Sequence, residues 1–79
     1  MALHIKLSTS LREYVEGYNP LHGLYLEKDT LATPIDVASK LGIPLAEIKI
    51  IMVNGQHGLP DSPLKDNDRV AFFPAVGGG

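Results

Sequence analysis

The alternation of apolar and polar residues predicts several short β-strands. From Leu3 to Leu7 the two kinds of residue alternate with a period of two, which places the apolar side chains on one face of a half-buried strand. A second apolar segment, Leu24–Leu26, follows a stretch of turn-forming residues. Ile48–Val53 is rich in β-branched residues and ends in Asn54-Gly55, a pair typical of tight hairpin turns. We expect this third strand to be buried on both faces.

The last strand is predicted over Arg69–Phe73. The preceding Asp66-Asn67-Asp68 indicates a turn, because asparagine adopts a positive φ at little cost. Val70 and Phe72 share one face of this strand, which we assign to the core. Strict alternation leaves Phe73 on the opposite face, so this large aromatic side chain is a candidate for exposure and for contact with a partner protein.

Two segments have the apolar spacing and end signals of helices. The main helix is predicted at about Pro34–Leu41, since Thr33 can cap its first turn and Gly42 can end it. One side of this helix is apolar and should pack on a sheet; its residues are Leu31, Ile35, Val37, Ala38 and Leu41. A short first helix is predicted after Ser10, which stands at capping-box spacing from Glu13.

The order of these elements predicts an α+β fold of the ubiquitin-like beta-grasp type. It consists of a mixed sheet of four or five strands, with the main helix packed across it, and a short first helix. The chain has 79 residues, enough for one domain with one core. We assign residues 1–73 to that domain and residues 74–79 to a flexible C-terminal Gly-Gly tail.

Composition and charge exclude several kinds of function. The net charge is −2 and the isoelectric point about 5.8, so the chain lacks the basic surface that a nucleic acid or an anionic membrane would require. The absence of cysteine excludes disulfides, thiolate metal sites and a thiol nucleophile. The N-terminal residues lack the apolar run of a signal peptide or a membrane span, and we expect a cytoplasmic protein.

No constellation of side chains with catalytic or metal-binding spacing is present. The histidines at positions 4, 22 and 57 are not spaced as metal ligands, and we interpret them as solvated surface residues. No serine or threonine has a basic partner at a recognisable spacing. We therefore expect no metal and no cofactor bound by this chain, and the sequence leaves open whether it is part of an enzyme.

The chain end is the segment with the most specific pattern. After Pro74-Ala75-Val76 the sequence closes with Gly77, Gly78 and Gly79. Such an ending is compatible with a flexible tail of no further function. Alternatively, six residues can extend about 20 Å and carry the terminal carboxylate into the active site of another protein. Because glycine has no Cβ, the last carbonyl would be open to attack.

The chain end resembles that of the MoaD/ThiS sulfur carriers, which are beta-grasp proteins ending in Gly-Gly. The small subunits of molybdopterin synthase typically end in Asp-Gly-Asp-x-Val-Ala-Phe-Phe-Pro-Pro-Val-x-Gly-Gly. This chain follows the pattern without insertion or deletion, as Asp66-Asn67-Asp68-Arg69-Val70-Ala71-Phe72-Phe73-Pro74-Ala75-Val76-Gly77-Gly78-Gly79. Asparagine replaces the family's glycine at position 67, and alanine replaces its second proline at position 75. Thiamine-type carriers usually lack the Phe-Phe-Pro motif, so the molybdopterin type is the closer match.

The resemblance implies a function in sulfur transfer. A ubiquitin-activating-like adenylyltransferase would use ATP and magnesium to adenylate the Gly79 carboxylate. A sulfur donor, such as a desulfurase, would then convert it to a thiocarboxylate, and the large subunit of molybdopterin synthase would receive the tail. In this interpretation Gly79 is the reactive residue, Gly77 and Gly78 belong to the tail, and Phe73, Pro74 and Val76 contact the partners.

Three alternative functions stay open at this stage. A ubiquitin-like modifier would use the same activated Gly79 to form an isopeptide bond with a lysine. A thiamine-type sulfur carrier would share the chemistry but serve another acceptor. A beta-grasp binding module would use the chain end for neither purpose.

Overall fold

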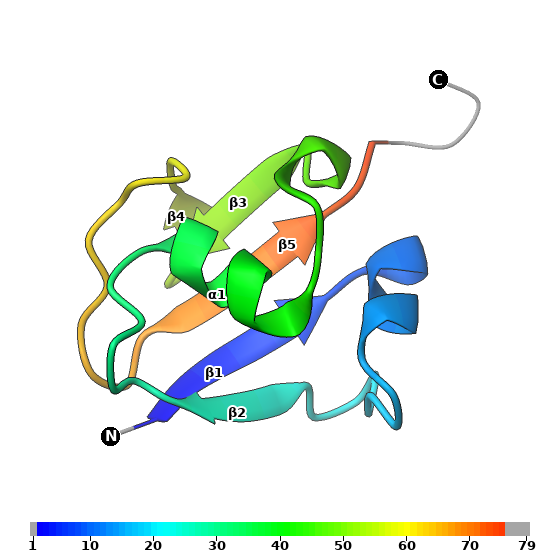
Figure 1. Ribbon diagram of the computed structural model, residues 1–79, viewed down its shortest axis with the longest axis horizontal. Coiled ribbons are helices and arrows are strands. Elements are labelled where there is room, and N and C mark those ends of the chain that lie inside the picture. Colours follow the sequence, from blue (N-terminus) through cyan, green and yellow to red (C-terminus); the bar gives the residue numbers. More distant parts are fainter. Residues whose placement is uncertain (1, 76–79) are drawn as a thin grey trace.

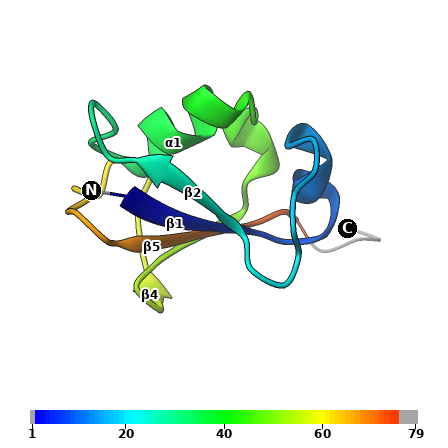
Figure 2. The ribbon, with the colours of Figure 1, turned by 90° about the horizontal axis from the view of Figure 1, so that it is seen from below.

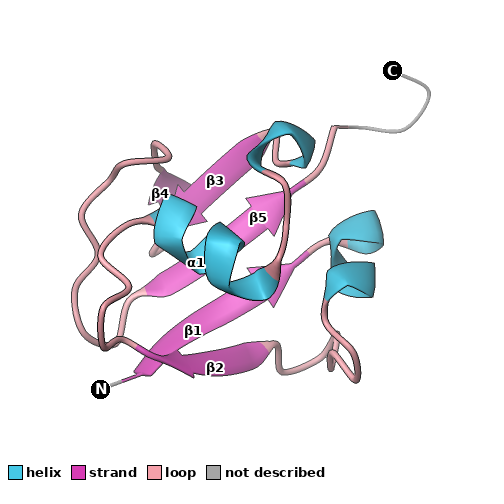
Figure 3. Ribbon diagram, in the orientation of Figure 1, coloured by secondary structure: helices cyan, strands magenta, loops and turns pink. Residues whose placement is uncertain are grey.

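The computed structural model describes residues 2–75 and contains five strands, one α-helix and two 3₁₀-helices (Figures 1 and 3). The elements in chain order are β1 (Ala2–Leu7), the 3₁₀-helix η1 (Thr9–Tyr14), β2 (Leu24–Glu27), α1 (Pro34–Leu41), the 3₁₀-helix η2 (Leu45–Glu47), β3 (Ile50–Val53), β4 (Gln56–His57) and β5 (Arg69–Phe73). The α+β beta-grasp prediction is confirmed, with five strands in the sheet.

The sheet is mixed, and the first and last long strands lie at its centre. Its strand order is β2-β1-β5-β3-β4. β1 and β5 pair in parallel, with Ile5 opposite Val70, whereas the other neighbouring strands are antiparallel. Because parallel strands end at the same edge, the chain leaves β5 at the edge where β1 leads into η1 (Figure 1).

α1 covers one face of the sheet and leaves the other face without a helix (Figure 2). The core lies between α1 and the sheet, and it is formed by Leu3, Ile5, Leu7, Leu11, Leu31, Val37, Ala38, Ile43, Ile51, Leu64, Val70 and Phe72. Val70 and Phe72 are fully buried, as predicted. We call the surface of the sheet opposite α1 the open face.

The ends of α1 follow the sequence prediction. The hydroxyl of Thr33 accepts a hydrogen bond from the backbone N–H of Asp36 at 3.4 Å. The carboxylate of Asp36 accepts from the N–H groups of Thr33 at 3.1 Å and of Ala32 at 2.8 Å, which completes a capping box. Gly42 ends the helix in the left-handed conformation, with φ of 76°. Ile35, predicted on the buried side, is instead 41% exposed, because Pro34, Val37 and Ala38 form the packed side.

The first helix differs from the prediction in type and in capping. η1 is a 3₁₀-helix whose N-cap is Ser8, and no side chain caps it. Ser10 lies exposed within the helix, so the predicted capping box from this residue is wrong. The backbone N–H of Ser8 donates to the carbonyl of Phe72 at 3.2 Å, which fixes the start of the segment. Leu11, which is fully buried, ties it to the core.

The third strand is shorter and less buried than expected. η2 occupies Leu45–Glu47, so β3 begins at Ile50 rather than at Ile48. Ile50 is 38% exposed because it lies on the open face, and the predicted burial of both faces is wrong. Asn54 and Gly55 form the predicted turn, which leads to β4, with φ angles of 53° and 80°.

Several expectations cannot be compared with the described residues. The predicted tail residues Val76, Gly77, Gly78 and Gly79 lie outside residues 2–75. The division into a domain of residues 1–73 and a tail of residues 74–79 therefore stays a prediction. Within the described part of the chain, no helix has the length and apolar character needed to cross a membrane.

Candidate functional site

Neighbouring segments hold the base of the C-terminal tail on both sides. The carbonyl of Phe73 accepts a hydrogen bond from the backbone N–H of Lys49 at 2.7 Å, and the carbonyl of Phe72 accepts from Ser8 at 3.2 Å. Pro74 is half-buried and Ala75 is exposed. The backbone is thus anchored up to Phe73, and the segment that follows starts from a fixed point at the edge of the sheet.

A second connection crosses the same end of the molecule on the α1 side. The hydroxyl of Tyr14 in η1 donates to the carboxylate of Glu47 in η2 at 2.7 Å. This hydrogen bond, together with partial burial and the nearby carboxylates, raises the pKa of Tyr14 above its ordinary value of 10.0, because each favours the neutral phenol. The bond joins the two 3₁₀-helices that flank the end of β5.

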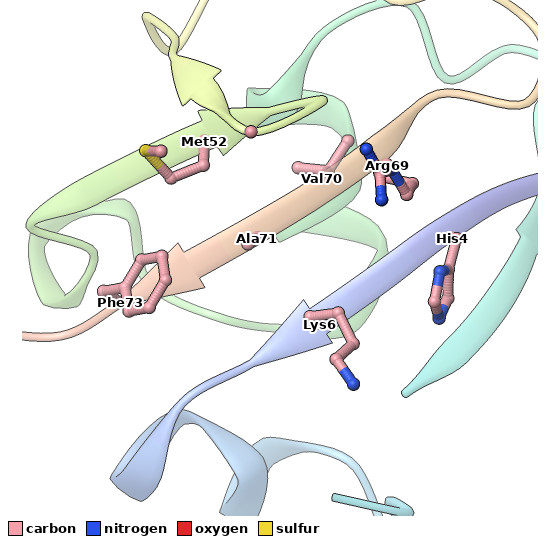
Figure 4. A pocket seen from close by; sticks show the side chains of 8 residues that line it. His4, Lys6, Met52, Arg69, Val70, Ala71 and Phe73 are labelled. Atoms are coloured by element: carbon pink, nitrogen blue, oxygen red, sulfur yellow. The ribbon is translucent and has the colours of Figure 1, made fainter. Parts of the chain in front are cut away.

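Phe73 lies on the open face, as strand alternation predicted, and is half-buried there. It borders a shallow hollow with a volume of about 440 Å³ (Figure 4). Ala71 lies at the middle of this hollow, between Lys6 of β1 and Met52 of β3 in the sheet register. Because Ala71 is small and its neighbours are long, the surface dips at this point. We call this depression the open-face hollow.

The side chains around the open-face hollow are apolar or basic. Lys6, His4 and Arg69 line it together with Met52 and Phe73. No aspartate or glutamate is among its lining residues, although the whole chain carries a net charge of −2. The hollow thus combines an apolar centre with cationic side chains, a composition that suits a complementary protein surface.

His4 is not the solvated surface residue that the sequence suggested. Its ring Nε2–H donates to the backbone carbonyl of His22 at 2.6 Å. The ring also stacks on Tyr25 of β2, with centroids 4.5 Å apart and an interplanar angle of 10°. His22 and His57 are exposed, as expected. The sequence carries no signal for the His4 contacts, because the acceptor lies 18 residues further along the chain.

The described residues contain no grouping of side chains suited to metal binding. Across residues 2–75, no cluster of three or more histidine, cysteine, aspartate or glutamate side chains is placed to hold a metal ion. Every buried side-chain nitrogen or oxygen among them has a hydrogen-bond partner.

Comparison with known proteins places the chain in a family. Residues 5–79 match the ThiS family. The chain belongs to the ThiS family. The matched range includes the closing glycines, and membership supports a role as a sulfur carrier or a ubiquitin-like modifier. No match was found among curated proteins.

Two solved structures share the fold of this ThiS-family protein. The crystal structure of SAMP1 from Haloferax volcanii has 19% sequence identity and a TM-score of 0.72, with all of both chains covered. The solution structure of the Haloferax volcanii HVO 2177 protein has 26% identity and a TM-score of 0.67, and covers 100% of this chain and 87% of that one. These similarities support the beta-grasp fold.

The sequence located only part of this region of the ThiS-family chain. It placed Phe73 and Pro74 correctly at the end of the last strand, while their contact with partners stays a prediction. It did not identify the open-face hollow, which His4 and Lys6 of β1 line together with Arg69 and Ala71 of β5. Alternation assigns each of these side chains to an outward face. Only the parallel register of β1 and β5 places His4 opposite Arg69 and Lys6 opposite Ala71.

Proposed function

We propose that this protein is a sulfur carrier whose Gly79 carboxylate is adenylated and then converted to a thiocarboxylate. The observation that carries the proposal is the match to the ThiS family through the closing glycines, on a domain that anchors its backbone up to Phe73.

The chemistry needs only the terminal carboxylate from this chain. An oxygen of the Gly79 carboxylate attacks the α-phosphorus of ATP, and pyrophosphate leaves with the electron pair of the broken bond. The resulting acyl adenylate has a good leaving group. A sulfur nucleophile at the oxidation level of sulfide then attacks the acyl carbon and displaces AMP. Magnesium, positioning and electrostatic stabilisation belong to the activating adenylyltransferase.

Phe73, Pro74 and Val76 have the role of guiding the tail into this enzyme. Phe73 borders the open-face hollow, so a partner that covers the hollow also contacts the base of the tail. Pro74 restricts the backbone at the point where the chain leaves β5, because its ring fixes φ. A partner bound at this end of the sheet receives the residues after Ala75 directly.

The acceptor of the sulfur is a molybdopterin precursor, bound by the large subunit of molybdopterin synthase. The support for this acceptor is the motif Phe72-Phe73-Pro74 and the in-frame pattern around it, which resemble the small subunits of that enzyme. The same tail would enter the activating enzyme first and the synthase subunit afterwards.

The test is a loading reaction followed by intact-mass measurement. The protein is incubated with its cognate adenylyltransferase, ATP, magnesium and sodium sulfide, with a matched reaction lacking ATP. We expect a product heavier by the difference between one sulfur and one oxygen atom, formed only with ATP. The loaded protein should then yield sulfur to the pterin precursor in the presence of the synthase large subunit. Larger conjugates with other proteins, without a thiocarboxylate, would instead indicate a modifier.

A further inference from the structure

Asn54 and Gly55, in the turn after β3, form the residue pair in which asparagine loses its side-chain amide most readily. The backbone nitrogen of the following residue attacks the side-chain carbonyl carbon, and glycine hinders this attack least because it has no Cβ. The chain contains two other asparagines, at positions 19 and 67, and neither precedes a glycine. Both residues of the pair are also exposed, so water reaches them freely.

The fold nevertheless holds the Asn54 side chain at both of its polar atoms. Its carbonyl oxygen accepts a hydrogen bond from the backbone N–H of Arg69 at 2.8 Å, and its amide group donates to the carboxylate of Asp68 at 2.8 Å. The backbone is held as well, because the N–H of Asn54 donates to the carbonyl of Arg69 at 2.8 Å. Three hydrogen bonds thus fix an exposed residue.

These hydrogen bonds oppose the geometry that the reaction needs. The first step brings Cγ of Asn54 to the backbone nitrogen of Gly55, so the carboxamide must turn away from residues 68 and 69. Turning breaks both side-chain bonds, and the bond to the Asp68 carboxylate is the stronger of the two because its acceptor is charged. It is also the bond that a side-chain substitution can remove.

We propose that Asn54 is a site of spontaneous deamidation and that the Asp68 carboxylate limits its rate by holding the amide in place. The nitrogen of Gly55 bonds to Cγ of Asn54, and the side-chain nitrogen leaves as ammonia with the proton that Gly55 gives up. Water then opens the five-membered ring and returns the N–H to Gly55. Attack of water at Cγ leaves an aspartate, and attack at the backbone carbonyl leaves an isoaspartate. This inference does not depend on the proposed sulfur-carrier function.

The product places two carboxylates where a hydrogen bond was. The oxygen that replaces the amide of Asn54 faces the carboxylate of Asp68, and two negative charges so close together repel each other. Gly55 and Arg69 also belong to the lining of the open-face hollow, which contains no aspartate or glutamate. Deamidation therefore weakens the link between the turns after β3 and before β5, and it adds negative charge beside a basic surface.

The first experiment measures deamidation in the folded protein. The full-length protein is incubated in mildly alkaline buffer, and peptide mapping by mass spectrometry follows the replacement of NH by oxygen at each asparagine. We expect Asp68→Ala to deamidate at Asn54 about tenfold faster than wild type, because it removes a hydrogen bond to a charged acceptor. Asp68→Asn, whose side-chain oxygen can still accept the bond, should react more slowly than Asp68→Ala. Asp66→Ala, in the same turn, should react at the wild-type rate.

A further control separates loss of the bond from loss of stability. Gly17→Ala introduces backbone strain at a φ of 73° in another part of the chain, and it should destabilise the protein about as much as Asp68→Ala does. We expect the wild-type rate at Asn54 in this variant. In urea that unfolds every variant, all should react at one common and higher rate, because the hydrogen bonds to Asn54 are then absent.

A second experiment examines the product. Asn54→Asp reproduces its aspartate form, and the urea midpoint of this variant at neutral pH should fall below that of wild type. Adding Asp68→Asn to it should restore the midpoint, because the amide then donates from position 68 to the carboxylate at position 54. A midpoint that stays low in the double variant would show that repulsion between the two carboxylates is not the cause.

The rates at Asn54 decide the inference. Equal rates in wild type and Asp68→Ala would overturn it, since the carboxylate would then not hold back the reaction. The same conclusion would follow if Gly17→Ala accelerated the reaction as much as Asp68→Ala, or if folded wild type reacted as fast as the chain in urea. None of these results bears on adenylation of the chain end, so the proposed function is tested separately.

Discussion

At the scale of single residues, the two phenylalanines of β5 lie on opposite faces of the sheet, and we expect them to contribute differently to the free energy of unfolding. Phe72 is fully buried between the sheet and α1, whereas Phe73 borders the open-face hollow. Phe72→Ala should lower the free energy of unfolding by about 3–5 kcal/mol, because it leaves a large cavity in the core. Phe73→Ala should lower it by about 1 kcal/mol, since its side chain is partly hydrated in the folded state. Urea denaturation of both variants gives the comparison.

The same pair separates stability from docking. Phe73→Ala should weaken binding to the activating enzyme even though the protein stays folded. If Phe73→Ala unfolds the domain and Phe72→Ala does not, the assignment of the two faces is inverted.

Two glycines with the same backbone angle differ in their surroundings and predict different tolerance to substitution. Gly17 and Gly23 both have φ of 73°. A Cβ at Gly17 would meet no atom within 4 Å, whereas at Gly23 it would collide with the carbonyl of Ile5 and lie 2.8 Å from Cδ of Lys6. Gly17→Ala should therefore cost about 1 kcal/mol from backbone strain alone. Gly23→Ala should cost clearly more, about 2–3 kcal/mol, since the turn must move away from β1.

Thermal or urea unfolding of the two glycine variants provides the measurement. Equal losses in both would mean that the close approach of the turn at residues 19–23 to β1 contributes nothing to stability. Hydrogen exchange at Leu21 and His22 should also accelerate in Gly23→Ala only.

At the scale of elements, local signals predicted those whose ends are set locally. Thr33 and Gly42 define α1 through hydrogen bonds and a backbone angle within or next to the helix, so the sequence alone located both ends. η1 has no such signal, because its start depends on a bond from Ser8 to the distant Phe72. The hydrogen bonds from Lys6 to the carbonyl of Leu21 and from His4 to the carbonyl of His22 are likewise long-range contacts, which hydrophobic periodicity does not report.

Hydrogen bonds between the Asp68 carboxylate and a neighbouring turn make the free energy of unfolding depend on pH. The carboxylate of Asp68 accepts from the side-chain amide of Asn54 at 2.8 Å and from the N–H of Lys65 at 2.7 Å. Burial by itself raises the pKa of Asp68, but these hydrogen bonds and the nearby lysines outweigh it and hold the pKa below its ordinary value of 3.8. The bonds join the turn after β3 to the turn before β5.

The sign of this effect follows from the lowered pKa. Because the folded-state pKa of Asp68 lies below the unfolded-state value, its contribution is present above about pH 4 and is lost as the pH falls through the folded-state pKa. Asp68→Ala should lower the free energy of unfolding by about 1 kcal/mol at neutral pH, and the difference from wild type should shrink in acid. Asp66→Ala, which removes an exposed carboxylate from the same turn, is the control for urea titrations at each pH. A constant difference between Asp68→Ala and wild type at every pH would contradict this account.

At the scale of the whole molecule, the arrangement of the sheet brings together features that lie far apart in the sequence. Four of the five strands could be predicted separately, whereas the two-residue strand β4 is exposed and has no such signal. The order β2-β1-β5-β3-β4 is set by how the four longer, amphipathic strands share one core under α1. The parallel pairing of β1 with β5 places His4 and Lys6 beside Arg69 and Ala71, so the open-face hollow extends along β5 from Arg69 to Phe73 at the base of the tail. Ile50 is exposed because it lies on the open face, although the sequence of its segment predicts a buried strand.

This arrangement separates folding from the reaction at the chain end. The core residues of the described chain all lie between Leu3 and Phe72, so changes at Gly79 should leave the free energy of unfolding within about 0.5 kcal/mol of wild type. Deleting Gly79, or adding one alanine after it, should nevertheless abolish thiocarboxylate formation. Deletion withdraws the carboxylate by about 3.5 Å, and addition moves it forward by the same length, whereas attack on the α-phosphorus of ATP requires much closer placement. Intact mass after incubation with the adenylyltransferase, ATP, magnesium and sulfide gives the result, and ordinary loading of the extended variant would show that the enzyme does not require the carboxylate of Gly79 itself.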